Sequence, residues 1–274
     1  MRRILDPLIK SVVRSDAGWY CGKLSLRFTE WLRYERSLYE HQLSEHRLGI
    51  FFSDLTVRDG YFKGLRYPGF GSFGSSLFPK LSGSYESELV PVFKELERNH
   101  YDQIIDIGCA EGYYAIGLAK KHPQAFVHAF DISENARRLC HTMAEINQVA
   151  ERIMVEGECT PKWLREMDAN VRRLLVCDCE GFERKLFDDT NVGSLAQCDL
   201  VVELHPMYYT DVKEYLHELF KDTHHITYVS SYDDARKIFD LPATYTSFPP
   251  VDKVKLVQEG RSFSMDWMIA QSNR

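Results

Sequence analysis

Two patterns of apolar and polar positions alternate along the chain from residue 101 onward. Short apolar runs indicate buried strands at 101–107, 125–131, 152–156, 172–178, 198–204, 225–230 and 262–270. Apolar residues at helical spacing between them predict helices at 113–122, 134–147, 161–170, 182–188, 191–196 and 210–221. Alternating strands and helices predict an α/β fold with a parallel sheet covered by helices on both faces.

The first third of the chain follows a different pattern. Residues 1–48 carry aromatic and aliphatic residues at helical spacing among many charges, which predicts a helical appendage. Residues 49–67 alternate as a hairpin does, and 68–84 are rich in Gly, Ser and Pro, as loops are. We therefore expect an appendage over 1–79, a main domain over 80–274, and an insertion at about 232–261.

The aromatic residues of the N-terminal segment allow three interpretations. Trp31, Leu32, Tyr34, Leu38 and Tyr39 recur at helical spacing. They could pack in a core, form a homodimer contact between the N-terminal helices of two chains, or cover a substrate. We expect core packing or the homodimer contact.

A glycine turn follows the first predicted strand. Residues 104–112 read Ile-Ile-Asp-Ile-Gly-Cys-Ala-Glu-Gly, so a strand with Asp106 near its end leads through Gly108 and Gly112 into a helix. Such a unit brings bare backbone and a helix N-terminus close to a ligand. The spacing is not G-x-G-x-x-G, and no Lys-Ser/Thr pair follows, which argues against a phosphate-binding loop. An acid at this point suits a cationic ligand.

Further acids are predicted at the ends of the following strands. Asp131 ends the second strand, 25 residues after Asp106, where a carboxylate can accept both hydroxyls of a ribose. Glu158 follows the third strand. Each acid alone could be an ordinary helix-start or surface residue, and it is their combination with the glycine turn that indicates a nucleoside site.

Two neighbouring strands end in acids and a histidine. Asp178 and Glu180 share one face at the end of the fourth strand, and Glu203 and His205 share one at the end of the fifth. A buried cluster of like charges needs a cation, a shared proton or ligand hydrogen bonds. The alternative is that these side chains cap the helices that follow.

These motifs resemble those of known methyltransferases. The D-x-G-x-x-x-G turn is similar to the first motif of S-adenosylmethionine (SAM) methyltransferases. D-x-E-G-x-E at 178–183, followed by a strand ending in E-x-H, resembles the FkbM family of O-methyltransferases. The segment 80–86, Lys-Leu-Ser-Gly-Ser-Tyr-Glu, is similar to one found in relatives that act on glycans. Cys109-Ala-Glu stands where Ala-Asn is usual, and Asp131 where Glu is common.

The resemblance implies a class I, Rossmann-like fold and a set of SAM contacts. The fold is a doubly wound, mostly parallel seven-stranded sheet whose last strand is antiparallel. The implied SAM-binding residues are Glu86, Asp106, Gly108, Cys109, Gly112, Asp131 and Glu158.

The expected activity is methyl transfer from SAM to a hydroxyl of a small acceptor, such as a sugar or glycosylated metabolite. We assign His205 as the base, because an imidazole titrates near neutrality, and Asp178 and Glu180 as catalytic residues beside it. Alternatively, Mg²⁺ bound by Asp178 and Glu203 activates the hydroxyl. We favour the metal-free form and expect backbone groups to satisfy Glu203. An NAD-dependent oxidoreductase and an inactive SAM-fold scaffold are the competing interpretations.

The composition limits which kinds of binding partner and which cellular compartment we expect for this chain. A formal net charge of −6 argues against general nucleic-acid binding, and no apolar run approaches the roughly 20 residues of a membrane span. The N-terminus lacks the apolar core of a signal peptide. Seven cysteines without C-x-x-C spacing indicate reduced thiols in a cytoplasmic protein.

Overall fold

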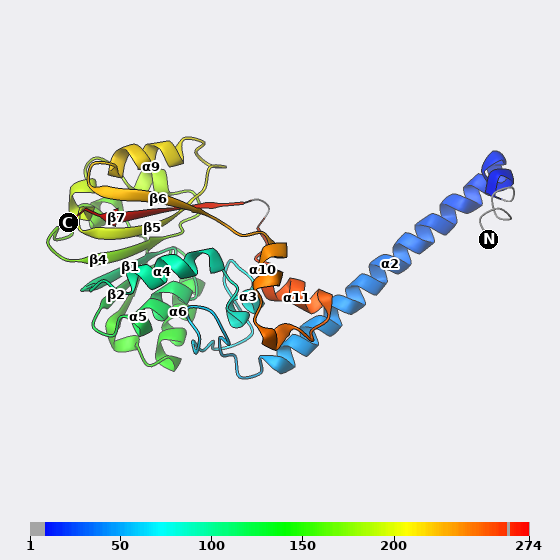
Figure 1. Cartoon of the computed structure of the whole chain (residues 1–274), viewed down its shortest axis with the longest axis horizontal. Helices are drawn as coiled ribbons and strands as arrows, with labels where there is room; N and C mark the ends of the chain where they lie inside the picture. Colours follow the sequence, from blue (N-terminus) through cyan, green and yellow to red (C-terminus); the bar gives the residue numbers. More distant parts are fainter. Residues whose placement is uncertain (1–8, 262–263, 274) are drawn as a thin grey trace. The chain divides into compact units, whose positions relative to one another are not determined.

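The computed structural model describes residues 9–261 and 264–273, and the chain divides into two compact units, Met1–Phe51 and Phe52–Arg274. The first unit contains α2, a continuous helix of 36 residues over Asp16–Phe51 (Figure 1). The helical N-terminal segment predicted from the sequence is therefore present. No helix in the described ranges is both long enough and apolar enough to cross a membrane.

A single seven-stranded sheet forms the centre of the second unit (Figure 1). Its strands are β1 Gln103–Ile107, β2 Phe126–Phe130, β3 Ile153–Glu156, β4 Arg173–Cys177, β5 Cys198–Leu204, β6 His224–Ser230 and β7 Asp266–Ser272. They lie in the order β3-β2-β1-β4-β5-β7-β6, and only β7 runs antiparallel to its neighbours. This is the strand order of class I methyltransferases, so the predicted fold class is confirmed.

Helices cover both faces of the sheet. Their bounds are α3 Leu77–Ser82, α4 Val90–Leu96, α5 Tyr113–Lys121, α6 Glu134–Ile146, α7 Pro161–Arg165, α8 Glu183–Leu186, α9 Val212–Phe220, α10 Asp234–Asp240 and α11 Pro250–Val257. Leu164, Leu186 and Leu216 from α7, α8 and α9 join one buried cluster with alternate residues of β1, β4 and β5. Helix α5 packs against β1 and β2 on the other side (Figure 1).

Hydroxyl side chains cap the starts of two of these helices. Ser133 Oγ accepts a hydrogen bond from the Ala136 N–H at the start of α6, and Thr160 Oγ1 accepts one from Trp163 at the start of α7. Each satisfies an amide that has no partner inside the helix. The predicted helix at 191–196 is a 3₁₀ turn over Val192–Leu195, and α7 ends well before residue 170.

The predicted hairpin at 49–67 is present only in part. The structure describes all of these residues, and they contain the end of α2, a series of turns and one isolated antiparallel bridge between Thr56 and Arg66. The apolar residues that suggested a strand are buried from turns: Phe62 lies 5.0 Å, between ring centres, from Tyr113 of α5. Residues 52–79 also belong to the second unit, so the boundary expected at 79/80 lies between Phe51 and Phe52.

The segment between β6 and β7 packs back onto the N-terminal part of the second unit. It contains α10, α11 and the 3₁₀ turn Ala243–Tyr245, and α11 lies against α3. Ser82 Oγ and Ser84 Oγ both donate to the carbonyl of Leu256, at 2.8 and 2.6 Å. These contacts hold the predicted insertion against α3 and the residues that follow it.

Candidate functional site

The glycine turn is held at the carboxyl end of β1 by close backbone contacts. Gly108 has φ +83°, and a Cβ there would lie 1.7 Å from the carbonyl oxygen of Asp178, which no side chain can occupy. The amides of Gly108 and Cys109 both donate to the carbonyl of Phe130, each at 2.9 Å. Gly112, at φ +98°, precedes the first residue of α5. The turn therefore lies between the ends of β2 and β4.

Asp131 joins the glycine turn to the end of β2. Its Oδ2 accepts from the Ala110 amide at 2.9 Å and its Oδ1 from the Ser133 amide at 2.7 Å. Each carboxylate oxygen has a second lone pair, and the residue is partly exposed. The next residue, Ile132, is 82% exposed. Glu158 lies exposed in the turn after β3.

Asp106 caps a helix from inside the core. The residue is buried, and its Oδ2 accepts from the Ala115 amide at 2.8 Å in the first turn of α5. Burial raises the pKa of Asp106 to about 7, although the hydrogen bond from Ala115 acts in the opposite direction. The structure thus gives Asp106 a role in positioning the loop, and its direct contact with a cofactor stays a prediction.

Glu111, inside the glycine turn, binds the segment that precedes the sheet. Its Oε1 lies 2.5 Å from Lys80 Nζ, and both side chains are buried. It also accepts from Ser72 Oγ at 2.9 Å and from the Phe73 amide at 3.1 Å. Burial alone would raise the pKa of Glu111, but the charge of Lys80 lowers it overall. These contacts of Glu111 hold residues 72–80 against the glycine turn. No role for Glu111 was predicted from the sequence.

The four residues predicted at the ends of β4 and β5 come together around an imidazole. His205 Nε2 lies 3.6 Å from a carboxylate oxygen of each of Asp178, Glu180 and Glu203. Its other nitrogen, Nδ1, lies 2.7 Å from Glu183 Oε1, inside the fold. Glu183 is the last acid of D-x-E-G-x-E, and the sequence analysis assigned it no function.

The surroundings of His205 and Asp178 raise the pKa of both residues. Burial lowers the pKa of His205, but the hydrogen bond to Glu183 and the surrounding carboxylates outweigh it, so the pKa is raised. Burial and the neighbouring Glu203 raise the pKa of Asp178 well above its ordinary value. The side chain of Glu180, by contrast, is 77% exposed. Ligand atoms of Asp178, Glu203 and His205 all lie within 4.8 Å of one another, a spacing that could hold a metal ion.

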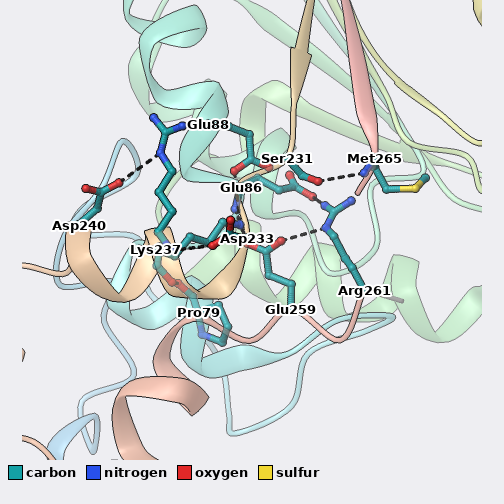
Figure 2. Close-up of polar contacts among 12 residues, drawn as sticks. Pro79, Glu86, Glu88, Ser231, Asp233, Lys237, Asp240, Glu259, Arg261 and Met265 are labelled. Carbon is teal, nitrogen blue, oxygen red and sulfur yellow. Dashed lines mark hydrogen bonds and ion pairs between the residues drawn. The ribbon is translucent and has the colours of Figure 1, made fainter. Parts of the chain in front are cut away.

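An arginine from the segment before β7 pairs with Glu203. Arg261 donates from Nη1 to Glu203 and from Nη2 to Glu86. Its Nε donates to Glu259 at 2.9 Å (Figure 2). We expected backbone groups to satisfy Glu203, and that expectation is wrong: its Oε1 is held by a guanidinium. Arg261 lies in no motif, so nothing in the sequence predicted this contact.

A buried lysine extends the same network (Figure 2). Lys237 of α10 bonds to Glu259 and lies 3.3 Å from Glu88, and all three side chains are almost fully buried. Glu86, an expected SAM contact, accepts from Tyr114 and Arg261. Burial raises the pKa of Glu86 to about 8, with Arg261 acting in the opposite direction. Lys237 and Arg261, both in the insertion at 232–261, thus form ion pairs with Glu88, Glu86 and Glu203 outside it.

Comparison with known proteins places the glycine turn in a methyltransferase segment. Residues 88–170 match the family model described as methyltransferase small domain. The match covers β1, β2 and β3 together with the glycine turn and Asp131. It confirms the methyltransferase class predicted from these motifs for this segment, while the FkbM family itself is not shown.

A curated relative agrees over a shorter stretch. The release factor glutamine methyltransferase of Synechocystis sp. is 42% identical over 55 residues, which is 20% of this chain and 18% of that protein. The chain thus matches about a fifth of the relative's length. The activity of the whole chain accordingly stays a proposal.

Solved structures of similar fold have low sequence identity. The O-methyltransferase TomG from Streptomyces achromogenes, in complex with SAM, has a TM-score of 0.45 and 12% identity, over 68% of this chain and 79% of TomG. Precorrin-6y C5,15-methyltransferase from Geobacter metallireducens also has a TM-score of 0.45 and 12% identity, over 69% of this chain and 88% of its own. We draw nothing about substrate from these likenesses.

Proposed function

We propose that the chain is a SAM-dependent methyltransferase that methylates a hydroxyl of a small molecule. The observation that carries the proposal is the position of the glycine turn and Asp131. Both lie at the carboxyl ends of β1 and β2, beside the point where the strand order reverses between β1 and β4. Open α/β sheets bind ligands at this place.

The residues around that point fit SAM. Asp131 uses one lone pair of each oxygen on the backbone, which leaves the second lone pairs for two ribose hydroxyls. The exposed side chain of Ile132 offers an apolar surface to an adenine ring. The surplus of carboxylates over cations around His205 suits a sulfonium ion.

His205 is the proposed base. Its Nδ1–H donates to Glu183, which leaves the lone pair on Nε2 directed toward Asp178 and Glu180. Bound SAM supplies an activated methyl group. His205 Nε2 would accept the proton of the acceptor hydroxyl as that hydroxyl is methylated. A positioned base of this kind contributes on the order of 10²–10⁴-fold. Asp178 and Glu180 orient the hydroxyl.

We infer a metal-free mechanism, although the alternative has a specific observation in its favour. Asp178, Glu203 and His205 have the spacing of a metal site, and their oxygen and nitrogen donors would suit Mg²⁺. However, Arg261 already holds Glu203 Oε1 as its cation. The positive charge of Arg261 would repel a metal ion bound to Glu203 Oε2, the oxygen that faces His205.

The finer assignment to the FkbM family, with a sugar or glycosylated acceptor, rests on sequence motifs. D-x-E-G-x-E is intact, and its acids surround the imidazole. An NAD-dependent oxidoreductase is disfavoured because the loop offers Asp106 and Glu111 where a dehydrogenase presents backbone amides to a pyrophosphate. An inactive scaffold would have no need of the ordered Glu183–His205 pair. The cytoplasmic location remains a prediction.

Incubation with methyl-labelled SAM and a fractionated metabolite extract tests the proposal. We expect one fraction to acquire label that survives mild base, as an ether does, and no label with His205→Ala. Label that base releases as methanol would indicate a carboxyl acceptor and contradict the assignment to a hydroxyl. SAM that binds without any transfer would favour the scaffold.

A further inference from the structure

Two cysteine thiols lie in contact at the end of β4. Cys177 is the last residue of β4, Cys179 follows it by two positions, and their Sγ atoms are 3.5 Å apart. Residues two apart in an extended chain point to the same side, which brings the two thiols together. Cys177 is fully buried, whereas Cys179 is partly exposed. We call these two residues the thiol pair.

The thiol pair is linked to the imidazole through Glu183. The Cys179 thiol donates to Glu183 Oε1 at 3.6 Å. The same oxygen lies 2.7 Å from His205 Nδ1 and accepts from the Gly181 amide at 3.1 Å. The Cys177 thiol in turn donates to Cys179 Sγ. A chain of hydrogen bonds therefore runs from Cys177 to the ring of His205, and its first two links depend on thiol hydrogens.

The backbone of the thiol pair also packs against the glycine turn. Asp178, between the two cysteines, donates its amide to the carbonyl of Ile107 at 2.9 Å. A Cβ on Gly108 would lie 1.7 Å from the Asp178 carbonyl oxygen and 3.4 Å from the Cys179 nitrogen. That peptide therefore leaves no free space beside the turn. A change in the torsions of residues 177–179 would accordingly reach both the proposed base and the glycine turn.

We propose that Cys177 and Cys179 form a redox switch, in which a peroxide converts the two thiols to a disulfide and turnover decreases. A disulfide has an S–S length of about 2.0 Å, so the two sulfurs must approach by roughly 1.5 Å. Residues two apart in an extended chain have Cα atoms roughly 6.6 Å apart, near the upper end of the roughly 4.4–6.8 Å that disulfides span. Such a bond is strained, and strained disulfides are readily reduced. A dithiol should therefore reverse the switch.

The partly exposed thiol reacts first. Burial raises the pKa of the Cys177 thiol, which keeps that sulfur protonated. The sulfur of Cys179 attacks one oxygen of hydrogen peroxide, the O–O bond breaks, and a sulfenic acid and one water form. The Cys177 sulfur then displaces the sulfenic oxygen, which leaves with the Cys177 proton as a second water. Both thiols are oxidised, the peroxide is reduced to water, and Glu183 Oε1 loses its thiol donor.

Formation of the disulfide does not depend on methyl transfer, whereas its effect on turnover rests on the proposed function. The bond is therefore measured separately. The full-length chain is treated with hydrogen peroxide, its free thiols are alkylated, and trypsin releases the peptide 174–184, which contains only these two cysteines. We expect this peptide to be lighter by two hydrogens and not alkylated. After reduction with a dithiol, both of its cysteines should be alkylated.

Turnover of methyl-labelled SAM measures the effect of the bond. Peroxide should decrease turnover of the wild-type chain at least about tenfold, because a misplaced base loses part of its contribution of 10²–10⁴-fold. A dithiol should restore it. Cys177→Ser removes the second thiol, so it should show neither the disulfide nor the loss that a dithiol reverses. The matched control is Cys140→Ser, which changes another fully buried cysteine and should keep the reversible loss.

Three outcomes would overturn the switch. They are alkylation of both cysteines of the peptide after peroxide, a disulfide that leaves turnover unchanged, and a reversible loss that persists in Cys177→Ser. Loss of the effect in Cys140→Ser alone would assign it to a different thiol and overturn the proposal equally. A disulfide in a chain that transfers no methyl group would support the bond between the two cysteines and contradict the proposed function.

Discussion

His205 Nδ1 lies 2.7 Å from Glu183 Oε1, and both side chains are almost fully buried. The contact leaves Nε2 as the only ring nitrogen directed toward the carboxyl ends of β4 and β5. It also favours the protonated ring, because Glu183 and its neighbours raise the pKa of His205 against the effect of burial. His205 should therefore need a higher pH than a free imidazole to be fully deprotonated and active as a base.

Replacing Glu183 with Gln should move the acid limb of the turnover profile to lower pH. The neutral imidazole accepts the proton, so the rate falls as pH drops through its pKa. Without the carboxylate that pKa decreases. Turnover at its optimum should also decrease, because Gln holds the ring less firmly. The measurement is kcat against pH for both proteins, and a limb that stays in place or moves upward would show that Glu183 does not set the pKa.

Replacing His205 with Ala should reduce turnover by roughly 10²–10⁴-fold with little change in SAM affinity, since the base acts only in the transition state. His217→Ala, a change in an exposed histidine of α9, is the control and should have wild-type kinetics. Equal loss of SAM binding in the His205 variant would indicate that the ring holds the cofactor.

Chelation should have no effect on turnover. Arg261 holds Glu203, so the site has a resident cation. Dialysis against EDTA should leave kcat unchanged, and added Mg²⁺ should not increase it. Loss of activity with EDTA that Mg²⁺ restores would establish the metal mechanism instead, with Asp178 and Glu203 as ligands.

Removing Arg261 should destabilise the protein. Arg261→Ala leaves Glu86 and Glu203 buried without their cation, a change that costs on the order of 3–5 kcal/mol. Arg236→Ala removes an exposed arginine from the same insertion and should cost less than about 1 kcal/mol. Thermal unfolding of both variants provides the comparison. Similar melting temperatures would mean that the network does not fasten the insertion.

The strands and the acids at their ends could be predicted because apolar runs bounded by glycine turns are local signals. Asp131, Asp178 and His205 each end such a run, and parallel strands bring their ends to one edge of the sheet. Arg261 could not be predicted this way, since it reaches Glu203 across 58 residues from a segment without periodicity. The hairpin at 49–67 is reduced to one antiparallel bridge, between Thr56 and Arg66, and most of the other residues of that range lie in turns.

Calorimetric titration with SAM and with NAD tests the central claim, a SAM site formed by the glycine turn and Asp131. The wild-type chain should bind SAM with one site per chain and should not bind NAD. Asp131→Ala should weaken SAM binding by about 10- to 100-fold, the equivalent of a lost charge-assisted hydrogen bond, while Asp222→Ala, an exposed control, should not. Binding of NAD without SAM, or unchanged SAM affinity in Asp131→Ala, would contradict the account.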